Sequence, residues 1–208
     1  MISELCVVIS MSVFKAYDIR GIAGDELNED FSKRLGKAIA THLEAECVSV
    51  VRDIRDSSPS YHEAFVKGLI SAGANVIDLG ISSTGVLYRS TVDLPVDVAV
   101  AITASHNPPE YNGFKICRGK LPLGGEDLQD IRRTFESGNF REGEGSYETR
   151  NDYENEYVNS ILNTVGKPDR DIRIVLDCGN AVPGPLAVKT LEELGIDVIP
   201  LYCDWDNS

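Results

Sequence analysis

Positive charge is scarce in this sequence. The 208 residues include 20 Lys and Arg against 33 Asp and Glu, which gives a net charge of −13. A protein that binds nucleic acid needs a basic face for the phosphate backbone, so this balance argues against DNA or RNA as a partner. An anionic small molecule would need a local basic cluster within the acidic field. The candidate members of such a cluster, each of which is otherwise a solvated surface charge, are Arg20, Arg52, Arg55, Lys115, Arg118 and Lys120.

Long hydrophobic runs are also missing. The apolar stretch 5–9 is far shorter than the roughly 20 residues that span a bilayer, and Glu4 precedes it where a signal peptide has Lys or Arg. We therefore expect no membrane partner. Residues 1–12 are interpreted as an extension ahead of the folded part, with Met11 as the alternative natural start.

The cysteines lack the spacing of a metal or redox motif. Five are present, and none of them belongs to a Cys-x-x-Cys pair. An odd number does not make a complete disulfide framework, and three of the five lie in apolar, strand-like runs. We interpret them as reduced, mostly buried thiols of a cytoplasmic protein.

The order of apolar patterns predicts an α/β protein. Strands are expected at 13–21, 48–51, 75–79, 96–102, 114–117, 172–176 and 196–202, with Gly21 at an exit turn. Helices are expected at 28–43 with Asn28 as cap, from 58 with Ser58 as cap, from 82, at 126–135, from 153 and from 183. Tyr61, Phe65 and Leu69 should form the apolar face of the helix from 58. Such alternation implies sheets with helices on both faces. We predict a three-layer α-β-α mixed-sheet domain over 13–136 and a linker over 137–150. The truncated start of a second domain of the same kind is expected over 151–208.

One loop combines residue types that do chemistry. Residues 103–115 follow a buried strand, and both Asn107-Pro108 and Asn112-Gly113 are turn signals. The loop lacks the Gly-x-Ser-x-Gly elbow of a serine hydrolase around Ser105. His106 and Lys115 instead supply the positive charge and donors that suit a transferring phosphoryl group. The alternative is a polar loop whose Ser105 and Asn107 bond the local backbone.

Three motifs resemble those of one enzyme family. The loop Thr-Ala-Ser-His-Asn-Pro-Pro-Glu-Tyr-Asn-Gly-Phe-Lys at 103–115 is similar to the phosphoserine loop of the α-D-phosphohexomutases, in particular their phosphomannomutase/phosphoglucomutase branch. Tyr-Asp-Ile-Arg-Gly at 17–21 and Asp-Cys-Gly-Asn at 177–180 resemble two further signatures, in family order. The resemblance implies a phosphohexomutase that moves a phosphoryl group between C1 and C6 of a hexose phosphate, through a phosphoserine and a bisphosphate intermediate.

The resemblance also implies roles for individual residues. Ser105 would carry the phosphoryl group, with His106, Lys115 and Arg20 as catalytic partners. Tyr17 and Asn107, together with Arg20 and Lys115, would bind the substrate. Mg²⁺ would bind Ser105 through its phosphate, and a hexose 1,6-bisphosphate would act as activator.

Structural alternatives exist for four of the residues in these motifs. His106 is also explained as a loop residue bonded to the backbone, and Tyr17 as a half-buried core residue with its hydroxyl at the rim. Asp177 and Asn180 fit a strand-to-helix turn better than a chemical role.

The sequence also lacks the Asp-x-Asp-x-Asp run expected of the family's metal loop. We therefore expect a fragment that is inactive alone, with missing C-terminal segments or self-association completing it. Three other readings stay open: a non-catalytic module that binds a phosphorylated ligand, a phosphatase-like enzyme with a phosphoserine intermediate, and a phosphoglucosamine mutase. The residues present do not choose between glucose and mannose.

Overall fold

The main sheet contains parallel and antiparallel strands. The computed structural model describes residues 13–206, so the expected extension 1–12 and the alternative start at Met11 lie outside the described residues. The strands are β1 (Ile19–Ile22), β2 (Cys47–Arg52), β3 (Asn75–Ile81), β4 (Val98–Ile102), β5 (Tyr111–Arg118), β6 (Leu121–Pro122) and β7 (Tyr147–Thr149). Their order is β1-β5-β4-β2-β3-β7, with β6 beside β5. β2, β3, β4 and β7 run parallel, whereas β5 is antiparallel to both of its long neighbours.

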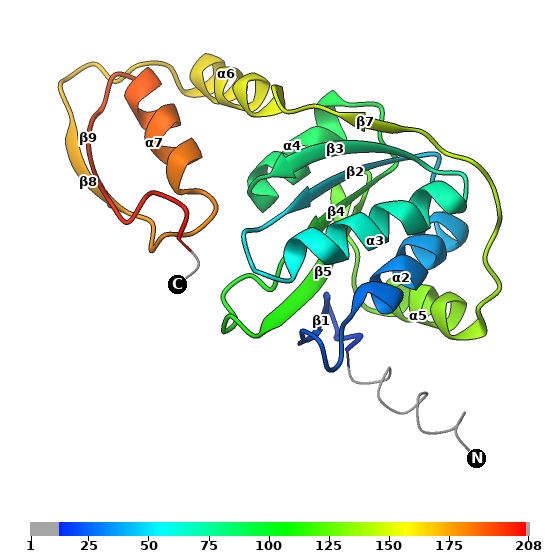
Figure 1. Cartoon of the computed structure of the whole chain (residues 1–208). Coiled ribbons are helices and arrows are strands. Elements are labelled where there is room, and N and C mark those ends of the chain that lie inside the picture. Colours follow the sequence, from blue (N-terminus) through cyan, green and yellow to red (C-terminus); the bar gives the residue numbers. More distant parts are fainter. Residues whose placement is uncertain (1–12, 207–208) are drawn as a thin grey trace.

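Helices cover both faces of this sheet (Figure 1). On one face lie α2 (Glu29–His42), α3 (Ser58–Ser71) and α5 (Glu126–Ser137), whose apolar side chains share one core with the sheet. On the other face lie α4 (Thr84–Asp93) and the start of α6 (Tyr153–Val165), which share a second core. The predicted three-layer α-β-α domain is therefore confirmed.

The helix starts follow from the sequence, with one shift. Asn28 caps α2, because its side-chain oxygen accepts a hydrogen bond from the Phe31 amide at 2.8 Å. For α3 the sequence indicated Ser58 as the cap, but the cap is Ser57. Ser58 is buried, and its hydroxyl is donated to Asp53 at 2.5 Å instead. The Ser58 side chain therefore bonds Asp53 and does not cap the first turn of α3, although serine is a preferred cap residue.

Two glycine-containing segments differ from their predictions. The Asn112-Gly113 pair was expected to form a turn but lies inside β5, where Gly113 pairs with Arg20 of β1. A Cβ on Gly113 would overlap the Ile19 carbonyl oxygen, so close strand approach explains this glycine. Gly21 likewise lies inside β1 rather than at an exit turn, and the strand expected over 13–21 is only Ile19–Ile22.

The segment expected to be a linker lies against the main domain. Within residues 137–150, β7 pairs in parallel with β3 at one edge of the sheet (Figure 1). Arg141 donates to the Ala72 carbonyl oxygen at 2.5 Å and also to that of Ala45. Phe140 packs against the first core. The contacts of Arg141 and Phe140 come from single side chains, and the segment has no hydrophobic periodicity. The sequence pattern therefore did not reveal that this segment packs on the domain.

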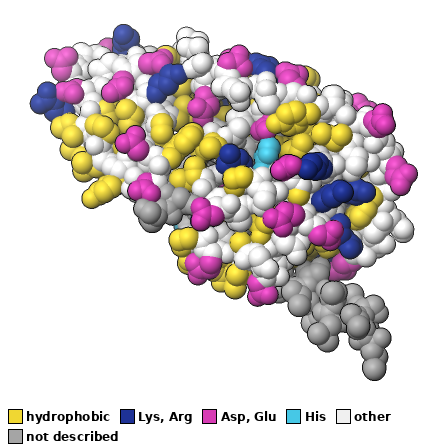
Figure 2. Space-filling model, in the orientation of Figure 1, with side chains coloured by type: hydrophobic (Ala, Val, Ile, Leu, Met, Phe, Trp, Pro, Cys, Tyr) yellow, Lys and Arg dark blue, Asp and Glu magenta, His cyan; other side chains and the backbone are white. Residues whose placement is uncertain are grey.

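A smaller unit follows, as predicted for the second α/β region. The strands β8 (Arg173–Asp177) and β9 (Asp197–Leu201) pair in parallel and are joined through α7 (Gly184–Glu193). Helix α6 connects the two units, because Tyr153 is buried in the second core and α6 also contacts α7. Figure 2 shows hydrophobic side chains gathered over this smaller unit. Its exposed large hydrophobic residues include Val175, Ile199, Leu201, Tyr202 and Trp205.

None of the helices within residues 13–206 combines the length and apolar character needed to cross a membrane.

Candidate active site

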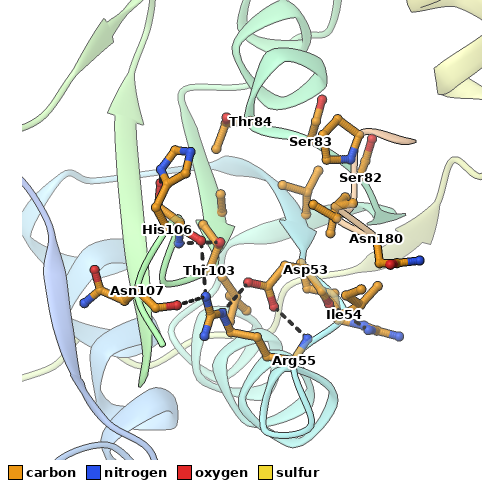
Figure 3. Close-up of a pocket in the computed structure, with 18 of the residues that line it drawn as sticks. Asp53, Ile54, Arg55, Ser82, Ser83, Thr84, Thr103, His106, Asn107 and Asn180 are labelled. Atoms are coloured by element: carbon orange, nitrogen blue, oxygen red, sulfur yellow. Dashed lines mark hydrogen bonds and ion pairs between the residues drawn. The ribbon is translucent and has the colours of Figure 1, made fainter. Parts of the chain in front are cut away.

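The candidate site lies where three parallel strands end. Arg52 at the end of β2 is in register with Ile81 of β3 and with Ile102 of β4, so the loops after these strands meet at one edge of the sheet. A cavity of about 380 Å³ opens between these loops and residues 179–183 of the smaller unit. Figure 3 shows Asp53, Thr84 and His106 around it, with Asn180 approaching from the other side. Open α/β sheets bind ligands at this kind of edge.

Ser105 lies on the cavity wall in an unusual backbone conformation. Its φ of 58° is in the left-handed region, which residues other than glycine seldom adopt. The Ser105 amide donates to the Thr103 hydroxyl at 3.0 Å, which closes the turn locally. The Ser105 hydroxyl lies 3.0 Å from His106 Nδ1, within proton-transfer distance. The loop thus presents a hydroxyl beside a base at the edge of a cavity.

The Arg55 side chain fixes the conformation of the Ser105 loop. All five of its N–H groups have acceptors, because Nε pairs with Asp53 at 3.1 Å and the two terminal nitrogens donate to four main-chain oxygens. These oxygens belong to Ser105 (3.1 Å), Asn107 (2.7 Å), Pro108 (2.6 Å) and Tyr111 (3.0 Å). Sequence reasoning placed Arg55 in a basic cluster and missed this role. The arginine fixes the loop and has no donor left over for an anion.

A polar network anchors Arg55 in turn. The Asp53 carboxylate accepts from the Arg55 amide at 3.1 Å and from the buried Ser58 hydroxyl at 2.5 Å. The buried side-chain amide of Asn112 donates to Ser58 at 3.0 Å and to Ser57 at 2.8 Å. The network ties the end of β2, the start of α3 and strand β5 together. Its only signal in the sequence is the cluster of Asp and Ser directly before α3.

Arg20 and Lys115 meet at a carboxylate that the sequence did not single out. Asp18 forms an ion pair with Arg20 and lies 3.6 Å from Lys115 Nζ. Arg20 also donates from Nη1 to the Asn107 side-chain oxygen at 2.7 Å, which joins it to the Ser105 loop. Its Nε is buried and has no hydrogen-bond partner. These two cations lie beside the loop rather than among the residues that line the cavity.

The remaining predicted residues are spread more widely. Tyr17 is 81% exposed and does not line the cavity. Arg52 lines the cavity, but Arg118 is the last residue of β5, at the opposite end of that strand, and Lys120 follows it. Arg118 there donates to the Leu43 carbonyl oxygen at 3.5 Å. The expected basic cluster is therefore wrong in these two members. The two ends of one strand are far apart, although their residues are close in sequence.

The signature at 177–180 forms a turn. Asp177 accepts from the Gly179 amide at 3.0 Å, and the Asn180 side chain donates to the Asp204 carbonyl oxygen at 3.0 Å. Asn180 also lines the cavity. Within residues 13–206 no group of three or more His, Cys, Asp or Glu is placed to hold a metal ion.

Comparisons with known proteins identify the family of this chain. The family model for phosphoglucomutase/phosphomannomutase, alpha/beta/alpha domain I, matches residues 11–142. A phosphomannomutase/phosphoglucomutase of Pseudomonas aeruginosa is 38% identical over 200 residues, and a phosphoglucomutase of Neisseria meningitidis is 36% identical over 204 residues. A phosphomannomutase of Salmonella typhimurium is 37% identical over 183 residues.

Solved structures extend the comparison to the fold. A phosphoglucomutase/phosphomannomutase family protein of Burkholderia thailandensis matches 95% of this chain with a TM-score of 0.90 and 35% identity. The chain covers 45% of that structure, 43% of the Pseudomonas protein, 44% of the Neisseria protein and 40% of the Salmonella protein. The corresponding shares of this chain are 95%, 96% and 85% for the three curated relatives. The chain thus spans less than half the length of these relatives. It belongs to the phosphoglucomutase/phosphomannomutase family and contains the alpha/beta/alpha domain I of that family.

Proposed function

We propose that this chain carries the phosphoserine of a phosphohexomutase, with Ser105 as the group that exchanges phosphate with a hexose phosphate. The observation that carries the proposal is the Ser105 hydroxyl, which is held in a left-handed turn at the cavity and lies 3.0 Å from His106 Nδ1. Arg55 supports this conformation through the loop carbonyl oxygens. Phosphoryl transfer depends mainly on positioning, which such a fixed loop supplies.

The proposed transfer has two balanced halves. A hydroxyl of the hexose monophosphate attacks the phosphorus on Ser105, the bond from phosphorus to Ser105 Oγ breaks, and the proton lost by the sugar hydroxyl is returned to Oγ. His106 Nδ1 is near enough to deliver that proton to Oγ. The bisphosphate formed then returns its other phosphate to Ser105 by the reverse steps, which leaves the phosphate at the other sugar position.

The pair Arg20 and Lys115 supports this role through charge. A transferring phosphoryl group carries negative charge on three oxygens, and fixed cations stabilise it. Asp18 holds both side chains, and the Arg20 bond to Asn107 keeps them next to the Ser105 loop. We propose that substrate or phosphoserine oxygens complete this arrangement.

We propose that Mg²⁺ binds this chain only through the phosphate on Ser105. The residues described do not fit a full metal site, since they contain no cluster of three candidate ligands. Asp53, which lines the cavity, already bonds Arg55 and Ser58. The free thiols described in the chain support a cytoplasmic setting, which also belongs to this proposal.

A non-catalytic phosphate-binding module is the second candidate. It is favoured by the position of Arg20 and Lys115 outside the cavity lining. The two candidates differ in one property: only the first transfers a phosphoryl group onto Ser105. The choice among glucose, mannose and glucosamine phosphates is not part of either proposal.

Incubation with glucose 1,6-bisphosphate tests the proposal. We expect the intact mass to increase by one phosphoryl group and peptide mapping to place it on Ser105. Ser105→Ala should abolish the increase, whereas Ser83→Ala, at another serine of the same cavity, should leave it unchanged. Phosphate on Ser57, Ser58 or Ser83 would contradict the assignment. Binding of the bisphosphate without any covalent increase would favour the non-catalytic module.

A further inference from the structure

Two cysteines lie side by side on the smaller unit. Cys178 follows β8 and Cys203 follows β9, and these parallel strands pair up to Asp177 and Leu201. The Cys178 amide continues the pairing by donating to the Leu201 carbonyl oxygen at 3.2 Å. The Cys203 thiol approaches two carbonyl oxygens, one of them that of Leu201, at 3.3 Å. The neighbouring Cys203 thiol helps to raise the pKa of Cys178, and both cysteines are free thiols.

An unusual backbone turn accompanies this pairing. Side chains alternate between the two faces of a regular strand, so a continued β9 would set Tyr202 beside Cys178 and point Cys203 to the other face. Tyr202 instead has a φ of 49°, in the left-handed region, which interrupts the alternation. Asn180 has a φ of 55°, and its main-chain amide donates to the Tyr202 carbonyl oxygen at 2.6 Å. Bulky residues adopt this conformation at a cost, and such outliers mark sites worth testing.

The cysteine pair adjoins the wall of the cavity. Cys178 is directly followed by residues 179–183, which line the cavity opposite Ser105. Trp205, the single tryptophan of the sequence, lies two positions after Cys203 and donates to the Val182 carbonyl oxygen at 3.0 Å. A structural change at Cys178 and Cys203 can therefore affect residues 179–183 in two ways. Cys178 is bonded directly to Gly179, and the Trp205 indole near Cys203 donates to Val182.

We propose that Cys178 and Cys203 form a reversible disulfide with a low-molecular-weight disulfide, such as oxidised glutathione, as the oxidant. The Cys178 thiolate attacks the glutathione disulfide and releases one glutathione thiolate, which takes up a proton. The Cys203 thiolate then attacks the Cys178 sulfur of the mixed disulfide and releases the second glutathione. The protein loses two protons and two electrons in all, and the glutathione disulfide takes them up to become two glutathione thiols.

The environment of each thiol assigns the order of these steps. Cys178 is only partly buried and meets the oxidant first, while Cys203 is 7% exposed and acts from within the protein. Burial and the neighbouring Cys203 thiol raise the pKa of Cys178 to about 11. The thiol form of Cys178 therefore dominates at neutral pH, so its attack on the oxidant is slow and becomes faster as the pH rises.

Peptide mapping of the oxidised wild-type chain tests the disulfide directly. Trypsin cuts after Arg173 and Lys189, so Cys178 lies in peptide 174–189 and Cys203 in peptide 190–208. After exposure to oxidised glutathione and alkylation of the remaining thiols, we expect these two peptides to be linked. In Cys203→Ser, Cys178 should instead retain glutathione, because no neighbouring thiol displaces it. In Cys178→Ser, neither the link nor the retained glutathione should form at this site.

Other thiols of the chain serve as controls. Cys47 on β2 and Cys117 on β5 are separated by strand β4, so no link between them is expected. Trp205 emission should shift when the wild type is oxidised and should not shift in Cys203→Ser. Retention of glutathione on wild-type Cys178 would overturn the disulfide. A link without any change in Trp205 emission would overturn its coupling to the cavity wall. Neither readout depends on phosphoryl transfer at Ser105.

Discussion

Arg55 donates from Nη2 to the main-chain oxygen of Ser105 at 3.1 Å. This bond joins the loop after β2 to Ser105, whose left-handed backbone conformation would otherwise be costly to maintain. Because the same guanidinium also reaches three other carbonyl oxygens of the loop, it acts as a template for the whole turn. The Ser105 hydroxyl is positioned by a residue that does not itself touch it.

We expect Arg55→Ala to lower the free energy of unfolding by about 3 kcal/mol, since it leaves Asp53 as an unpaired charge in a mostly buried site. Phosphoryl uptake by Ser105 should fall as well. Arg55→Lys should restore little of either property, because an ammonium group lacks the planar fork that serves several acceptors. Urea unfolding and phosphopeptide analysis measure the two effects.

Arg52→Ala is the matched control for Arg55. Arg52 lines the same cavity, but its side chain donates to one neighbouring carbonyl oxygen, that of Asp53, at 3.1 Å. We expect its removal to change stability by less than about 0.5 kcal/mol, as for most surface changes. Equal losses in both variants would show that Arg55 has no special role in the loop.

Lys115→Ala should slow phosphoryl uptake from glucose 1,6-bisphosphate without a measurable loss of stability. Lys115 pairs with Asp18 next to the Ser105 loop, at 3.6 Å and with part of its side chain in solvent. Lys120→Ala is the control, because this exposed lysine follows the far end of the same strand. Uptake rates measured by intact mass decide the matter. Similar rates for both variants would remove Lys115 from the proposed transfer.

Acid should weaken the contact between β7 and the sheet. Burial alone would raise the pKa of Asp78, but His62 at 3.2 Å, the Tyr147 hydroxyl at 2.6 Å and the Gly80 amide at 2.8 Å together hold it below its usual value. A carboxyl whose pKa is lowered on folding stabilises the protein above its unfolded pKa of roughly 4 and loses that contribution as the pH falls through the folded value.

The stability difference between wild type and Asp78→Asn should therefore be largest near neutral pH and should narrow as the pH falls below about 4. Urea unfolding at a series of pH values measures it. Glu148→Gln, a change at an exposed neighbour on β7, should give a small difference that varies little with pH. A constant difference for Asp78→Asn across the series would show that the carboxylate charge contributes nothing.

Gly68→Ala should destabilise the protein by several kcal/mol, roughly 3 or more. A Cβ on Gly68 of α3 would overlap the carbonyl oxygen and carbon of Lys33 on α2, and backbone atoms cannot move aside as a side chain can. Lys67→Ala, at the adjacent exposed position, should have an effect below about 0.5 kcal/mol. Thermal unfolding compares the two. A stable Gly68→Ala variant would mean that α2 and α3 can separate without cost.

We expect no mutase turnover from residues 1–208 by themselves, because they span about 43% of the Pseudomonas relative and the described part holds no metal cluster. Coupled assays with glucose or mannose 1-phosphate, Mg²⁺ and a bisphosphate activator test this. Turnover in the ordinary enzyme range of roughly 1–1000 per second would refute it. The uptake of phosphate by Ser105 is a separate, single event and is expected regardless.

The sequence by itself determined the element types and the reactive loop. The cap at Asn28 and the apolar positions Tyr61, Phe65 and Leu69 are local patterns, and each appears in the structure as expected. The strand predicted over 96–102 is present as Val98–Ile102. The motif at 103–115 identified the family, because such a long run of specific residues can be recognised without knowledge of the fold.

Only the tertiary structure decided which side chains support that loop. Arg55 is distant from Ser105 in sequence and reaches it because β2 and β4 are neighbours in the sheet. Asp18 gained its place between Arg20 and Lys115 through the pairing of β1 with β5. The edge strand β7 was missed for the same reason. Its partners lie on β3, and local periodicity carries no information about contacts between segments far apart along the chain.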